Sequence, residues 1–178
     1  MTSQTTLAWY FSAADRRLRY GDGREIKAGV THEFYGNPEL CQRGLHASID
    51  PLHALGYAPG PIIWRVRMSG VIVRGDDKLV ATRRTYLWGY DATEVLRAFA
   101  RKCALDVIDK WDAPAIVREY LETSDESKRA AARAAAWAAA RDAAWEAARA
   151  AAWAAAWDAA WEAQNKRLLQ MIRKGRAK

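Results

Sequence analysis

The sequence predicts an α+β protein: a small strand-rich domain covered by helices, followed by one long α-helix. Three observations lead to this prediction. The first ninety residues contain short apolar runs separated by glycine, proline and aspartate turns. From Asp91 the apolar residues recur at helical spacing. From residue 124 onward alanine dominates, and glycine first reappears at Gly175. We therefore predict an α+β domain at residues 1–123 and a long helix at 124–178.

The longest predicted strand is Ile62–Val73. Within it Trp64, Val66 and Met68 alternate with arginines, which is the pattern of a half-buried strand, and Gly70 is expected to bend it. A short helix is predicted at residues 51–58, with Asp50 as its cap and Pro51 at its first position. The other predicted extended segments are Leu7–Ser12, Arg16–Tyr20, Val30–Tyr35, Gly44–Ser48 and Leu79–Trp88.

Helices are predicted to cover the sheet after residue 91. Asp91 and Glu94 resemble a helix cap, and the apolar positions from Val95 to Trp111 fit a helical period. Pro114 opens a further short helix that reaches Glu122.

The long helix is predicted from its caps as well as its composition. Thr123 and Glu126 have capping-box spacing, and Gly175 is a natural residue just beyond a helix end. About fifty residues would span roughly 75 Å. A domain of 125 residues is only about 35–40 Å across. Half of the helix is therefore expected to protrude, unless it breaks near Gln164-Asn165.

This helix contains an internal repeat. Residues 133–148 and 149–164 agree at 14 of 16 positions, and tryptophan or arginine recurs every four residues. Exposed tryptophans promote association with other apolar surfaces. The tryptophan/arginine row is therefore expected to pack on its own domain, self-associate or bind another molecule. The alternative is slippage of a repetitive coding tract that stayed helical. The predicted partner-binding residues are Trp137, Arg141, Trp145, Arg149, Trp153, Trp157 and Trp161.

The formal net charge of +7 is unevenly distributed. Residues 1–125 hold 17 Lys/Arg and 16 Asp/Glu, whereas residues 126–178 hold 11 and 5. A basic end can bind nucleic acid through charge alone, but it is more often a solvated helix end.

Several classes of protein are disfavoured. No signal peptide or long apolar span is present, so a cytoplasmic protein without membrane contact is expected. Cys41 and Cys103 lack metal-ligand spacing and are expected to be reduced thiols. The sequence contains no Walker loop, GxGxxG, HExxH or GxSxG, so neither a cofactor nor a metal is predicted.

Two small groups of residues are candidate ligand sites. His46, Ser48 and Tyr57 form a compact polar group beside turns, where a histidine in a cleft could bind a ligand or shuttle protons. The alternative is that His46 and Ser48 satisfy buried backbone groups. Arg83 and Arg84 beside aromatic residues would suit a phosphate, although alternate exposed arginines are common at strand ends.

Residues 7–123 resemble a family of uncharacterised phage and prophage proteins. The resemblance lies in Cys41-x-x-Gly44-Leu45-His46-Ala47-Ser48, Ala54-Leu55-x-Tyr57-Ala58-Pro59-Gly60 and Asp77-Lys78-Leu79-Val80-Ala81. It implies a phage context, and thus a location in the host cytoplasm, but no activity.

The same strand and helix are more distantly similar to ADP-ribosyltransferase-like domains. That similarity implies NAD binding with a histidine, a tyrosine and a late glutamate. His32 or His46, Tyr57 and Glu94 would take these roles, although Glu94 is better explained as a helix-cap residue.

The function predicted first is that of a non-enzymatic interaction protein. It would form a homo-oligomer and bind a host protein through the tryptophan/arginine row, for example as a counter-defence inhibitor. The alternative is an NAD- or nucleotide-binding domain that is oligomerised by the helix. Nucleic-acid binding by the basic end is a third hypothesis.

Overall fold

The computed structural model describes residues 5–147 and 154–177, and it describes no side chain between residues 141 and 159. The chain divides into two units. The sheet unit comprises Met1–Val95 with Asn165–Lys178, and the helical unit comprises Leu96–Gln164. The chain thus leaves the sheet unit after Val95 and returns to it at Asn165. The sequence-based division at residue 123 stays a prediction.

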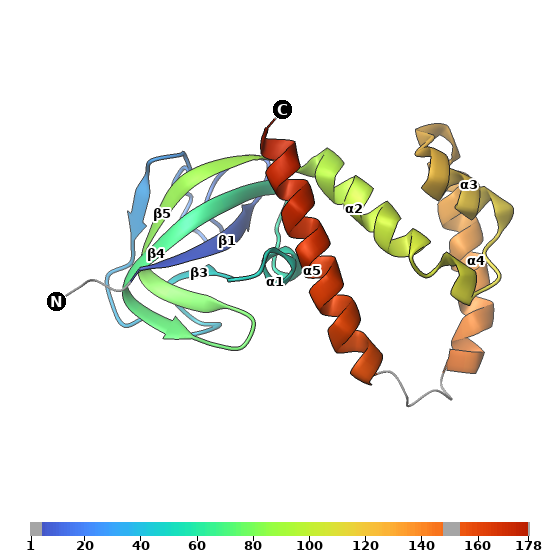
Figure 1. Cartoon of the computed structure of the whole chain (residues 1–178). Coiled ribbons are helices and arrows are strands. Elements are labelled where there is room, and N and C mark those ends of the chain that lie inside the picture. The colour runs from blue at the N-terminus through green and yellow to red at the C-terminus, as the bar shows by residue number, and fades with distance from the viewer. Residues whose placement is uncertain (1–4, 148–153, 178) are drawn as a thin grey trace. The chain divides into compact units, whose positions relative to one another are not determined.

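The sheet unit is built on a five-stranded antiparallel sheet (Figure 1). Its strand order is β1-β4-β5-β2, and β3 also pairs with β5. The long hairpin of β4 and β5 is central because both strands have alternating, half-buried sequences. The strands are β1 (Thr6–Ser12), β2 (Thr31–Glu33), β3 (Leu45–Ala47), β4 (Ile62–Arg74) and β5 (Leu79–Asp91).

The predicted α+β class and the strands at β1, β3, β4 and β5 are confirmed, and β2 is shorter than predicted. The bend at Gly70 is also confirmed, since its φ is +79° and the β4–β5 register shifts between Ser69 and Ile72. The predicted strand Arg16–Tyr20 is wrong. Arg16 and Tyr20 both have positive φ, so this segment turns and makes only the isolated bridge Arg17–Glu25.

One face of the sheet carries the main core. Trp64 and Tyr86 are fully buried there and meet edge to face, with ring centroids 5.5 Å apart. The Trp64 indole N–H donates to Ser12 Oγ at 3.0 Å, which satisfies the polar end of this large side chain. Leu18 and Ile26 from the loop between β1 and β2 pack against the same cluster. The loop is therefore part of the core.

Helix α1 (Pro51–Gly56) and the last turns of α5 (Ala154–Arg176) belong to the sheet unit as well. Pro51 occupies the first turn of α1 as predicted, but the Asp50 side chain makes no capping bond. The backbone N–H of Leu52 donates to Asn165 Oδ1 at 3.2 Å. The sequence-based alternative of a break at Gln164-Asn165 is wrong, because α5 continues through both residues.

The end of α5 is packed closely onto the sheet (Figure 1). Leu168 and Ile172 are fully buried, and the Tyr90 hydroxyl donates to the Ile172 carbonyl at 2.7 Å. A Cβ on Gly175 would lie 2.6 Å from Val95 Cγ2. Gly175 therefore lies inside the helix to allow close approach, and its predicted role just beyond the helix end is wrong.

The helical unit contains the end of α2 (Thr93–Leu105), α3 (Ala115–Thr123), α4 (Arg129–Ala147) and the start of α5. Two short 3₁₀ turns, η1 (Ile108–Lys110) and η2 (Glu126–Lys128), join the first three helices. Asp91 caps α2 as predicted, since its Oδ1 accepts from the Thr93 N–H at 2.8 Å. Helix α3 begins directly after Pro114, also as predicted.

The predicted capping box of Thr123 and Glu126 is wrong. Ser124 adopts a left-handed conformation that ends α3, and the Asp125 carboxylate instead accepts from the Ser127 N–H at 3.0 Å. A single helix over residues 124–178 is not confirmed either, because the described helices are α4 and α5. None of the described helices combines the length and apolar character needed to cross a membrane.

Candidate functional site

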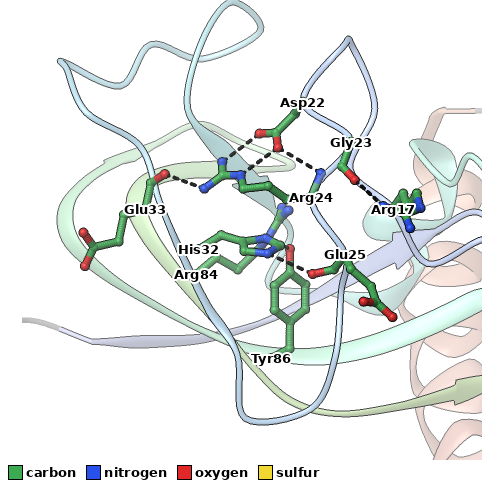
Figure 2. Close-up of polar contacts among 9 residues, drawn as sticks. All are labelled: Arg17, Asp22, Gly23, Arg24, Glu25, His32, Glu33, Arg84 and Tyr86. Atoms are coloured by element: carbon green, nitrogen blue, oxygen red, sulfur yellow. Dashed lines mark hydrogen bonds and ion pairs between the residues drawn. The ribbon is translucent and has the colours of Figure 1, made fainter.

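A buried polar cluster lies where β2 and β5 meet the loop before β2 (Figure 2). The His32 ring contacts the Glu25 carbonyl through Nε2 at 3.0 Å and the Tyr86 hydroxyl through Nδ1 at 3.2 Å. A carbonyl can only accept, so Nε2 carries the proton and Nδ1 accepts from the Tyr86 hydroxyl. Both nitrogens of the buried His32 ring are thus engaged within the fold.

Arg84 completes this cluster. It lies two residues before Tyr86 on β5, so both side chains are on the same face of the strand. Its side chain is only 2% exposed. Its Nε donates to the Tyr86 hydroxyl at 2.9 Å, its Nη1 donates to the His46 carbonyl at 2.5 Å, and the guanidinium lies 3.8 Å from the Tyr10 ring centroid. These partners are uncharged, so hydrogen bonds and ring stacking stabilise the buried cation.

The two neighbouring arginines therefore do not form one surface patch. Arg83 points to the other side of the strand, where its Nε lies 3.0 Å from the Glu33 carboxylate. Arg84 braces β5 against β3 inside the unit.

A second arginine, Arg24, links the loop before β2 to β2 itself through hydrogen bonds. Arg24 binds both carboxylate oxygens of Asp22, at 2.6 and 2.7 Å, and its Nη1 donates to the Glu33 carbonyl at 2.9 Å (Figure 2). This fork-like hydrogen bonding lowers the pKa of Asp22. Burial, followed by the charges of Arg24 and Arg84, lowers the pKa of His32. The cluster is therefore built around a neutral histidine and serves as an internal brace.

This arrangement predicts a loss of stability in mild acid. The unfolded chain takes up a proton on His32 near pH 6.5, whereas the folded chain takes it up only at lower pH. The unfolded state then binds more protons, so the free energy of unfolding decreases as the pH falls below about 6.5. The pKa of His46 is also lowered, mainly because its ring is buried. Urea unfolding at pH 7.5 and 5.5 measures the difference, and His32→Gln should reduce it. Equal stability of the wild type at both pH values would contradict the prediction.

His46 is half-buried beside the turn at residues 39–43. Its Nε2 accepts from the Cys41 backbone N–H at 3.1 Å. Ser48 is buried, and its backbone pairs with Trp9 in both directions at 2.7 and 2.9 Å. The His46 ring therefore supports a backbone N–H of the turn, and Ser48 joins β1 through its backbone.

Tyr57 lies on the surface at the end of α1. Its hydroxyl donates to the Asp77 carboxylate and accepts from Lys78 Nζ at 3.0 Å. This contact raises the pKa of Lys78, and a hydrogen bond to the Cys41 side chain adds to the effect. The nearby pocket has a volume of about 70 Å³. Pockets for small ligands typically have roughly 300–1,000 Å³, so this one is too small for a dinucleotide.

The residues suggested by the ADP-ribosyltransferase-like resemblance are thus in different environments. The His32 ring is engaged in the buried cluster, His46 supports a turn, and Tyr57 binds Asp77 and Lys78. Glu94 is exposed in the first turn of α2. Nucleotide binding stays a prediction.

The helical unit contains a larger concavity, the apolar groove, with a volume of about 420 Å³. Ile108, Val117 and Ala132 form the buried core beneath it. Two arginines, Arg129 and Arg133, are exposed at its edge on α4. The residues that line the apolar groove are Ala104, Val107, Ile108, Trp111, Val117, Tyr120, Leu121, Arg129, Ala132, Arg133 and Ala136.

The predicted tryptophan/arginine row is described in part. Trp137 follows the last groove residue of α4, and its side chain is 66% exposed. Trp161 on α5 is half-buried. The side chains of Arg141, Trp145, Arg149, Trp153 and Trp157 lie outside the described residues.

Sequence reasoning missed both the internal brace and the apolar groove. A signal for the brace was present, because Arg84 and Tyr86 are two residues apart and so share one strand face. The groove had no comparable signal, since Trp111 and Tyr120 appear in sequence as ordinary core residues.

Comparison with known proteins gives one finding. Residues 15–98 match the family model of a domain of unknown function (DUF7666). The match covers β2 to β5, which confirms similarity to an uncharacterised domain family over this part of the chain. Neither a curated protein nor a solved structure matches the chain.

Proposed function

We propose that this chain is a non-enzymatic interaction protein that self-associates and binds a host protein through its helical unit. The sheet unit would act as the scaffold. In a phage setting, binding to a host protein would interfere with defence or metabolism. The observation on which the proposal depends is the apolar groove beside the exposed Trp137.

The size and composition of this surface favour binding of a protein segment. Its volume of about 420 Å³ exceeds that of the pocket near Tyr57 several-fold. Aromatic residues and arginine are the side chains that most often carry binding energy at protein interfaces. Trp111, Tyr120, Arg129, Arg133 and Trp137 are residues of this kind within or beside one groove.

The chain path also supports the proposal. Helix α4 packs against α3 in the helical unit, and the last turns of α5 are buried in the sheet unit, so a folded part of the chain lies on either side of the repeat at residues 133–164. A segment held at both ends loses less conformational freedom on binding than a free tail does, which favours association.

The nucleotide-binding alternative receives less support. The hydroxyl of Tyr57 is already engaged by Asp77 and Lys78, and the adjacent pocket is small. Nucleic-acid binding through the basic end also has weaker support, since Arg176 lies 4.4 Å over the Trp88 ring in the sheet unit.

The test is light scattering after size-exclusion chromatography on the full chain. The wild type is expected to be an oligomer. The variant with alanine at Trp137, Trp145, Trp153, Trp157 and Trp161 is expected to be a monomer with unchanged helix content, because alanine is the best helix former. As a control, Tyr20→Ala with Tyr35→Ala removes exposed aromatic area from the sheet unit and should leave the oligomer intact. An unchanged assembly in the tryptophan variant would disprove the proposal.

A further inference from the structure

We propose that Arg65, Arg173 and Arg176 form an anion site, the arginine site, on the face of the sheet against which the end of α5 packs. Its ligand is a dianionic phosphate group, as in inorganic phosphate or a phosphomonoester. The site lies in the sheet unit, whereas the proposed function depends on the helical unit. The two proposals can therefore be tested separately.

Arg65 lies on a surface of aromatic rings. In the strand register it is opposite Trp9 of β1 and opposite Trp88 of β5. Its guanidinium lies 4.5 Å from the Trp9 ring centroid, and the rings of Trp9 and Trp88 meet edge to face with centroids 5.6 Å apart. Trp9 is itself buried, so this surface is fixed by the core. A guanidinium that stacks on such a ring keeps the N–H donors at its edge available for hydrogen bonds.

The end of α5 brings two further arginines to the same place. Arg176 lies 4.4 Å from the centroid of the Trp88 ring, and Trp88 is the cross-strand partner of Arg65. Arg173 is three residues before Arg176, so the two side chains are neighbours on one helix face. Burial lowers the pKa of Arg65, and the nearby charge of Arg173 lowers it further. Three like charges are therefore gathered on one surface.

No carboxylate offsets these charges among the residues that the structure describes. Residues 62–75 contain no acidic side chain, and the last acidic residue before the end of α5 is Glu162. Glu162 is eleven residues before Arg173, or roughly 16 Å along the helix axis. By contrast, Arg24 and Arg83 of the same unit each bind a carboxylate. An anion bound among the three arginines would relieve their mutual repulsion.

The charge and shape of the site favour a phosphate dianion. The planar fork of a guanidinium matches the oxygens of a phosphate group, and three cations attract a dianion more strongly than a monoanion. A phosphodiester carries only one negative charge per phosphate. Arg65 and Arg176 also occupy ring surface of Trp9 and Trp88 on which a nucleobase would stack. The ligand is therefore recognised through its phosphate group.

A titration of the full chain with inorganic phosphate at constant ionic strength tests the site. NMR follows the Nε–H signal of Arg65 and the indole N–H signals of Trp9 and Trp88, which are expected to shift and saturate. Arg173→Gln changes an exposed helix residue and is expected to weaken binding at least about tenfold, the loss of one hydrogen bond to a charged group. Arg65→Lys should also weaken it, because an ammonium lacks the planar fork.

The matched control removes positive charge elsewhere in the sheet unit. Arg19 and Arg43 are exposed and already have carboxylate partners. The double variant Arg19→Gln with Arg43→Gln should therefore leave the phosphate affinity unchanged. Shifts that do not saturate, wild-type affinity in Arg173→Gln or Arg65→Lys, or an equal loss in the control would overturn the proposal.

A second titration distinguishes the classes of phosphate. Phenyl phosphate is a dianionic monoester at neutral pH and is expected to bind as inorganic phosphate does. Dimethyl phosphate is a monoanionic diester and is expected to bind at least about tenfold more weakly, since it offers one negative charge fewer to the three cations. If dimethyl phosphate or duplex DNA binds as well as phenyl phosphate at equal phosphate concentration, the ligand is a phosphodiester and the assignment is wrong.

Discussion

Ile172→Asp is expected to unfold the sheet unit. Ile172 is fully buried, and its carbonyl accepts from the Tyr90 hydroxyl at 2.7 Å. The change removes a buried apolar side chain, which costs about 2–5 kcal/mol in comparable cores. It also buries a carboxylate that lacks a partner, which adds several kcal/mol. Together these losses approach the whole stability of a typical domain, about 5–15 kcal/mol. Circular dichroism during thermal unfolding measures the effect.

Gln170→Asp is the matched control, because it introduces the same charge on the exposed side of the same helix. It should melt within a few degrees of the wild type. If Ile172→Asp also melts like the wild type, the end of α5 does not cover the sheet in solution. Loss of folding in Ile172→Asp alone would show that the last turns of α5 are part of the core of the sheet unit.

Arg84→Met is expected to destabilise the sheet unit by about 2–4 kcal/mol. Methionine keeps the apolar stem but removes the donors to the Tyr86 hydroxyl and the His46 carbonyl. A buried acceptor that is left unsatisfied costs about 1–3 kcal/mol. Arg84→Lys should recover little, because an ammonium cannot reproduce the planar fork that reaches both acceptors. Urea unfolding of the full chain measures the free-energy change.

Arg83→Met is the control for this measurement. Arg83 is the adjacent residue of β5, and its ion pair with Glu33 is exposed. Its loss should cost less than about 1 kcal/mol. Similar effects of the two substitutions would contradict the internal brace and would suggest that Arg84 is as accessible as its neighbour.

Local sequence was sufficient for several elements. The alternation in Ile62–Val73 predicted β4, including the buried positions of Trp64, Val66 and Met68. Asp91 and Pro114 marked the beginnings of α2 and α3. These predictions succeeded because side-chain alternation and helix capping act over a few residues.

The candidate site could be predicted less well. The sequence suggests Arg83 and Arg84 together as a phosphate site, although strand alternation sends neighbouring side chains to opposite faces. The contact of His32 with Tyr86 depends on the register in which β2 pairs with β5, where Arg84 lies opposite His32. Register joins segments about fifty residues apart, and no local pattern in either segment specifies it.

The C-terminal segment shows most clearly which features the local sequence determines and which depend on tertiary contacts. Its alanine-rich composition, with Leu168 and Ile172 one turn apart, by itself determined that it would be helical, because helix propensity is a property of each residue and its neighbours. Only the tertiary structure decided that its last turns cover the sheet and that Gly175 lies against Val95. The physical reason is that burial of an apolar stripe requires a complementary surface, and that surface is formed by residues more than seventy positions earlier in the chain.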